Sequence, residues 1–129
     1  MPLTQSPFRF RLDNGSGVPV YRQLIDQVQA GIATGTLTVG HQIPTVRQVA
    51  VDLAINPNTV MRAYRELEIR GVLDTQQGTG TFIAARGPQI EDDERTRRLE
   101  QLIDEFVARA GAGGFTLAEI LDALKERGK

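Results

Sequence analysis

The sequence predicts an α+β fold, in which three helices and a β-hairpin are followed by a tail of two helices. Apolar residues recur at helical spacing in three successive segments between residues 19 and 71. Two strand-like segments around a glycine-containing turn come next, and two amphipathic segments follow a break at residues 86–89. Hydrophobic residues make up 40% of the 129 residues and charged residues 24%, an ordinary globular balance.

Residues 8–13 alternate apolar and charged side chains, the period of a half-buried strand, and the glycines of residues 14–17 end that pattern. The first helix is expected to begin at Pro19, which suits a first helical turn, and to end near Gly35. Its inner face contains four apolar residues at intervals of four: Val20, Leu24, Val28 and Ile32.

A short second helix is expected after Thr45, a good N-terminal cap, and a three-residue turn separates it from the third. Asn56 can cap the third helix, and Pro57 suits its first position because no backbone N–H is needed there. Gly71 is its expected stop. The inner face of the third helix is predicted to be Val60, Ala63, Tyr64 and Leu67.

The segments 72–75 and 81–84 are expected to be strands of a hairpin, and two further helices are expected beyond residue 90. The last helix opens with a capping box formed by Thr116 and Glu119. This order of elements is that of a winged helix-turn-helix followed by a short two-helix dimerisation tail. We therefore expect a DNA-binding domain over residues 1–86 and a helical dimerisation tail over residues 87–129.

The predicted DNA-binding residues lie at the start of the second helix, on the third helix opposite its apolar face, and at the hairpin tip. Arginine and asparagine on the third helix can bond guanine and adenine edges in the major groove, and the tip glycines allow a close approach. A solvated basic face and a plain tight turn are the alternatives. The predicted residues are Thr45, Arg47, Gln48, Asn56, Asn58, Thr59, Arg62, Arg65, Gln77, Gly78 and Thr79.

Four segments closely resemble the DNA-binding domain of GntR-family bacterial transcription regulators: residues 43–50, 56–68, 71–73 and 78–82. The Asn-Pro-Asn-Thr-Val start of the third helix and the short tail are similar to the YtrA-type branch. The resemblance implies that Arg47, residues 56–59 and Gly78 approach DNA. Many relatives carry arginine where this chain has Pro57 and Met61, so part of the base readout is expected to differ.

Charge is divided unequally between the two parts of the chain. Residues 1–88 hold eight arginines against six acidic residues, and residues 89–129 hold seven basic against ten acidic, for a total of −1. Such an asymmetry suggests different partners, here double-stranded DNA and a second copy of the chain. Folding of the tail onto its own DNA-binding domain is the alternative. The predicted dimerisation residues are Leu99, Leu102, Ile103, Phe106, Leu117, Ile120, Leu121 and Leu124.

The predicted function is that of a homodimeric transcriptional repressor at a palindromic operator, because repression requires only that a promoter be occupied. The alternative is a winged-helix module whose basic face binds an acidic protein partner. An enzyme is not predicted: a related branch is fused to an aminotransferase, but no pyridoxal-phosphate lysine or catalytic domain follows here. No small-molecule effector is identified from the sequence.

No cofactor or metal site is predicted. The chain has no cysteine and one histidine, His41, which is expected to be an ordinary polar residue of a loop. The acidic run at residues 91–94 is expected to favour a helix start rather than to hold a cation. No apolar stretch approaches the roughly 20 residues of a membrane span, so a soluble, cytoplasmic protein without a membrane partner is expected.

Overall fold

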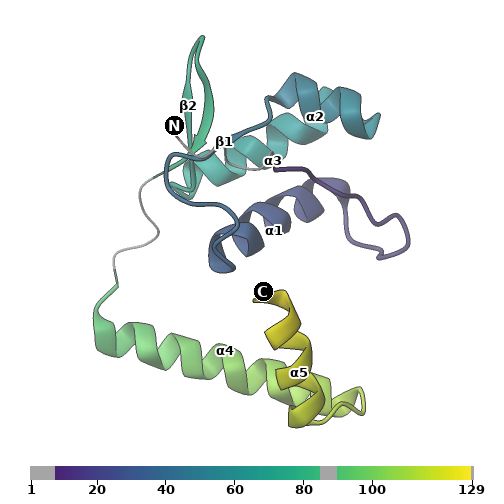
Figure 1. Cartoon of the computed structure of the whole chain (residues 1–129), viewed down its shortest axis with the longest axis vertical. Helices are drawn as coiled ribbons and strands as arrows, with labels where there is room; N and C mark the ends of the chain where they lie inside the picture. Colours follow the sequence, from purple (N-terminus) through teal and green to yellow (C-terminus); the bar gives the residue numbers. More distant parts are fainter. Residues whose placement is uncertain (1–7, 85–89, 129) are drawn as a thin grey trace. The chain divides into compact units, whose positions relative to one another are not determined.

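The structure is a computed structural model that describes residues 8–84 and 90–128 (Figure 1). The chain divides into two compact units at the boundary between Pro88 and Gln89. That boundary and the one expected after residue 86 fall outside the described residues, so the exact domain border stays a prediction. Among the helices described, none combines the length and the apolar character needed to cross a membrane.

Helix α1 (Val20–Ala33) packs against the extended residues 8–13, which were expected to form a strand. Burial alternates as predicted, but no strand of the described sheet pairs with this segment. Instead, side-chain amides of α1 form hydrogen bonds of 2.6–3.0 Å with backbone N–H and C=O groups of the extended segment. The strand prediction is wrong because glutamine side chains, and not a neighbouring strand, form the hydrogen bonds that this backbone needs. The two pairs are Gln27 with Arg11 and Gln23 with Asp13.

Helices α2 (Val46–Leu53) and α3 (Pro57–Ile69) are joined by the predicted three-residue turn. Ala54 in this turn has a left-handed backbone conformation with a φ of 54°. The next N–H, that of Ile55, donates to the carbonyl of Ala50 at 3.0 Å and closes α2. A left-handed conformation costs a non-glycine residue about 1–2 kcal/mol. The packing of α2 against α3 therefore stabilises a left-handed conformation that Ala54 by itself disfavours.

The predicted hairpin is confirmed as strands β2 (Leu73–Gln76) and β3 (Gly80–Ile83), each shifted by one residue toward the turn. A third strand, β1 (Gln42–Ile43), pairs antiparallel with β3 and completes a sheet in the order β1-β3-β2. Two residues are too few to show a period, so the sequence pattern could not reveal β1. The β2–β3 hairpin extends away from the three helices (Figure 1).

The N-terminal unit has a continuous core of fourteen buried hydrophobic residues from the helices, the strands and the extended segment. The predicted inner face of α3 is confirmed, since all four of its residues are buried. The prediction for α1 is less accurate, because Val20 is half-buried and Ile32 is 37% exposed. His41 is buried beside the sheet, and its carbonyl accepts from the N–H of Ile83 at 2.9 Å.

The C-terminal unit contains α4 (Asp92–Ala112) and α5 (Leu117–Arg127), and α5 turns back from the end of α4 (Figure 1). The predicted capping box at the start of α5 is confirmed. The Thr116 hydroxyl accepts from the N–H of Glu119, and the Glu119 carboxylate accepts from the N–H of Thr116, both at 3.2 Å. Ile120 is the one buried hydrophobic residue of this unit's described part.

Candidate nucleic-acid interface

The start of α3 is held by its own cap. The side-chain oxygen of Asn56 accepts from the backbone N–H of Asn58 at 2.8 Å, as expected for an N-cap, and Pro57 follows it in the first turn. The Asn56 oxygen is thus committed to the backbone, whereas the exposed side chain of Asn58 points away from the core. The cap therefore sets the position of Asn58 at the leading end of the helix.

The exposed side of α3 is mostly polar and basic. Asn58, Arg62 and Arg65 are exposed opposite the buried stripe, and Met61, at 42% exposure, borders them. Thr59 is half-buried, so its side chain is less accessible than the sequence pattern suggested. A helix with this surface can lie in the major groove and present its polar side chains to base edges.

A capping box that the sequence analysis missed occupies two predicted DNA-binding residues at the start of α2. The Thr45 hydroxyl accepts from the Gln48 N–H at 3.2 Å, and the Gln48 amide oxygen accepts from the Thr45 N–H at 2.8 Å. The spacing Thr-x-x-Gln was a sufficient signal for it. The capping box holds the Gln48 side chain against the Thr45 backbone but leaves its amide nitrogen available as a donor, and Arg47, exposed beside it, keeps its whole guanidinium group.

Tyr64 links the buried side of α3 to the segment that leads into α2. Its hydroxyl donates a hydrogen bond to the carbonyl of Pro44, the residue before the Thr45 cap. Burial raises the pKa of Tyr64 well above its ordinary value, so the hydroxyl stays protonated and remains a donor. This bond fixes the start of α2, and with it Arg47, relative to α3.

Arg62 is stacked rather than extended into solvent. Its guanidinium carbon lies 3.7 Å from the centre of the Tyr21 ring on α1. Glu66, one turn further along α3, bonds Arg70 at 2.9 Å and so does not neutralise Arg62. The sequence pattern placed Arg62 on the outward face but could not reveal this contact, because Tyr21 belongs to another helix.

The hairpin tip has the open backbone that was expected, and β1 supports it. Gln77, Gly78 and Thr79 are exposed, with Gly78 at a φ of 79°. The Gln42 amide on β1 donates to the Thr79 carbonyl at 3.3 Å. A Cβ on Gly80, which has a φ of 143°, would lie 2.4 Å from that amide nitrogen. The φ of Gly80 favours glycine, and a larger residue there would also push the Gln42 amide away from the Thr79 carbonyl.

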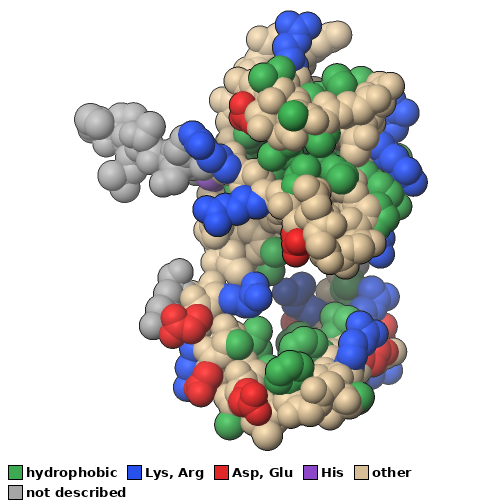
Figure 2. All heavy atoms as spheres, turned by 90° about the vertical axis from the view of Figure 1, so that its right-hand side faces the viewer, with side chains coloured by type: hydrophobic (Ala, Val, Ile, Leu, Met, Phe, Trp, Pro, Cys, Tyr) green, Lys and Arg blue, Asp and Glu red, His purple; other side chains and the backbone are tan. Residues whose placement is uncertain are grey.

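The C-terminal unit leaves apolar surface uncovered. Seven of the eight predicted dimerisation residues are 48–63% exposed, and only Ile120 is buried. Hydrophobic side chains gather on one face of this unit between charged ones (Figure 2). An open hollow of about 570 Å³ lies between α4 and α5, and its apolar lining comprises Phe106, Ala110, Phe115, Ile120, Ala123 and Leu124.

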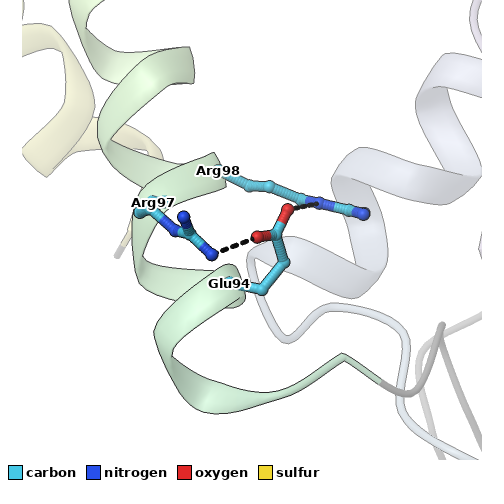
Figure 3. Close-up of polar contacts among 3 residues, drawn as sticks. All are labelled: Glu94, Arg97 and Arg98. Carbon is cyan, nitrogen blue, oxygen red and sulfur yellow. Dashed lines mark hydrogen bonds and ion pairs between the residues drawn. The ribbon is translucent and has the colours of Figure 1, made fainter.

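The acidic run at the start of α4 is used within its own helix. Asp92, Asp93 and Glu94 lie in the first turn, where the helix dipole favours negative charge. The Glu94 carboxylate also accepts from Arg97 at 2.7 Å and Arg98 at 3.1 Å (Figure 3). Across residues 8–84 and 90–128, no three histidine or acidic side chains are grouped as a metal site would require.

The helix pair α2–α3, with its exposed basic surface and adjoining hairpin, defines a winged helix-turn-helix protein of the DNA-binding kind. Residues 20–83 match the family model described as bacterial regulatory proteins, gntR family. The regulator Rv1152 of Mycobacterium tuberculosis is 44% identical over 111 residues, 86% of this chain and 87% of that protein. The repressor YtrA of Bacillus subtilis is 29% identical over 116 residues, 90% of this chain and 89% of that protein.

Solved structures agree with these relatives. A GntR family regulator from Listeria monocytogenes superposes with a TM-score of 0.56 at 31% identity, covering 86% of this chain and 96% of that one. The DNA-binding domain of AraR in complex with operator ORX1 superposes with a TM-score of 0.53 at 26% identity, covering 60% of this chain and 99% of that one. The chain belongs to the GntR family, in its YtrA-type branch. It is a DNA-binding transcription regulator and not an enzyme.

Proposed function

We propose that this regulator is a repressor that binds a palindromic operator as a homodimer. The observation that carries the proposal is the division of surfaces between the two units. The N-terminal unit buries its apolar residues and exposes Arg47, Asn58 and Arg65, whereas the C-terminal unit exposes most of its apolar residues. The first surface suits DNA, and the second suits another protein surface of the same apolar kind.

A second copy of the chain is the partner that best covers the tail. Full burial of a leucine or phenylalanine side chain is worth roughly 1.5–3 kcal/mol. Seven of the predicted dimerisation residues, six of them leucine or phenylalanine, are 48–63% exposed. A large uncovered apolar patch of this kind marks an interaction site. The hollow between α4 and α5 can receive apolar side chains from the second copy. In a twofold-symmetric dimer, the hollow of the second copy receives the same side chains from the first.

A homodimer sets the geometry of its operator. Two copies of α3 related by a twofold axis read the same half-site in opposite directions, and so they require a palindrome. The half-sites are expected about one DNA turn apart, roughly 34–36 Å between centres, or a multiple of that spacing.

Repression is supported by the relative YtrA of Bacillus subtilis, whose name describes it as a transcriptional repressor. Occupancy of a promoter is sufficient for repression and needs no contact with polymerase. The cytoplasm, where bacterial DNA lies, follows as the proposed location. DNA-binding relatives also favour DNA over an acidic protein as the partner of the basic face.

Sequencing the DNA fragments that the full chain retains from a genomic library tests the operator. We expect an enriched inverted repeat near a promoter. If a dimer neutralises about six phosphates, the logarithm of the binding constant should fall against the logarithm of the salt concentration with a slope of roughly −5. An enriched site with no inverted repeat would contradict the palindrome. Binding that does not change with salt would contradict the proposed DNA contacts.

Sedimentation of the full chain beside a chain that ends at Arg86 tests the dimer. The shorter chain retains the whole fourteen-residue core, so it is expected to fold, to sediment as a monomer and to bind the operator far more weakly. A monomeric full chain would contradict the dimer and favour the alternative, in which the tail folds onto its own N-terminal unit. A dimeric shorter chain would place the interface in the winged helix.

A further inference from the structure

The contact between Arg62 and Tyr21 joins two helices at the edge of the DNA-binding surface. The guanidinium of Arg62 stacks over the phenol ring at 3.7 Å, and the ring is half-buried against the hydrophobic core. A stacked guanidinium uses its face, whereas its five N–H donors lie in its plane and stay available. Tyr21 therefore orders the side chain without consuming its hydrogen-bonding capacity.

The position of this contact separates Arg62 from the other polar residues of α3. Tyr21 is the second residue of α1, so the guanidinium lies on the flank of α3 that faces α1. A helix in the major groove presents its central residues to base edges and its flanks to the phosphates that border the groove. Asn58 lies near the middle of the exposed face, with Arg62 and Arg65 to either side of it, and only the Arg62 guanidinium is held toward α1.

Local charge favours an anion at this flank. Glu66, which could pair with Arg62 one turn away, is paired with Arg70 instead. The first turn of α1 contains no acidic residue and no side-chain cap, so its positive end is not neutralised there. Arg62 thus keeps its full charge beside a helix end that also favours negative groups.

We propose that Tyr21 is a positioning residue that holds Arg62 as a contact to the DNA phosphate backbone, not to a base. The proposal rests on the proposed DNA-binding function and assigns one part of its interface. Such a contact strengthens binding to every sequence equally and carries no base preference.

The test measures affinity of the full chain for its selected operator and for a scrambled duplex, at several salt concentrations. Arg62→Ala is expected to weaken both complexes by the same factor and to reduce the magnitude of the salt slope by about one per protomer. Tyr21→Leu is expected to weaken both about two- to fivefold per protomer, the range of an exposed cation–π contact. Tyr21→Phe, which keeps the ring, should bind as the unchanged protein does.

The double variant Tyr21→Leu/Arg62→Ala distinguishes positioning from a general structural role. We expect it to bind no more weakly than Arg62→Ala alone, because Tyr21 acts only through the arginine. Arg97→Ala in α4, with the same loss of charge, should leave both the affinity and the salt slope unchanged.

Two results would overturn the inference while the proposed function stands. One is a loss of preference at a single operator position in Arg62→Ala, which would make this residue a base reader. The other is a further loss from Tyr21→Leu in the Arg62→Ala background. If the unaltered chain binds no duplex at all, the proposed function fails, and the phosphate contact fails with it.

Discussion

The two units of this regulator bury their apolar residues to very different extents. Of the fifteen buried hydrophobic residues in the described chain, fourteen belong to the N-terminal unit and only Ile120 to the tail. Yet the tail helices are locally well formed, with a capping box at Thr116 and ion pairs from Glu94. Local signals are thus sufficient to form helices, whereas a core requires surfaces from several elements to meet. The N-terminal unit supplies those surfaces itself, and the proposed second copy supplies them for the tail.

The largest expected effect comes from placing a charge on the tail's apolar face. Phe106→Glu would bury two carboxylates in the proposed interface, so the dimer is expected to dissociate and operator affinity to fall roughly 100-fold or more as avidity is lost. Sedimentation and a binding titration measure the two effects. Ala108→Glu, which adds the same charge on the opposite side of α4, is the matched control. Equal behaviour of the two variants would show that this face of α4 has no partner.

The next prediction compares one leucine from each unit. Leu67→Ala, at a fully buried site, is expected to lower the free energy of unfolding by about 2–5 kcal/mol. Leu102→Ala, at a site 63% exposed, is expected to change the stability of the N-terminal unit by less than about 0.5 kcal/mol. Both tyrosines lie in the N-terminal unit and the chain has no tryptophan, so tyrosine fluorescence in urea reports on that unit alone. A similar shift from both substitutions would mean that the two units unfold together.

A smaller effect is expected at the DNA-binding surface, where the N-terminal unit exposes polar and basic side chains. Arg47→Ala should cost roughly 1–3 kcal/mol of operator binding and relax the preference at one position per half-site. A selection of bound sequences, repeated with the variant, measures both. An equal loss on operator and scrambled duplex would identify Arg47 as a phosphate contact instead.

The smallest effect concerns the turn between α2 and α3. Glycine adopts the left-handed conformation of Ala54 without strain but is more flexible when unfolded, so Ala54→Gly should stabilise the N-terminal unit by about 0.5 kcal/mol. Ala30→Gly, in the exposed part of α1, should destabilise it by about 1 kcal/mol. Urea denaturation of both variants provides the comparison. A loss of stability from both would show that the turn is not strained.

Most elements of the fold could be predicted because their signals are local. The caps at Thr45, Asn56 and Thr116 each mark a helix start within a few residues, and the spacing of apolar residues identified the buried face of α3. The extended segment 8–13 shows the limit of this reasoning. Its alternation predicted the burial of its side chains, but the partner of its backbone proved to be the amides of α1.

The sequence by itself determined the helices, the hairpin, the family and the outward position of the arginines on α3, because periodicity, capping and turn residues act over a few neighbouring positions. The tertiary structure alone decided which groups meet across the chain. It placed β1 beside β3, Gln42 under the hairpin tip, the Tyr64 hydroxyl on the carbonyl of Pro44, and Arg62 on Tyr21. These contacts join residues 20 to 41 positions apart, and no local pattern encodes them, because they form only when packing of the core brings distant segments together.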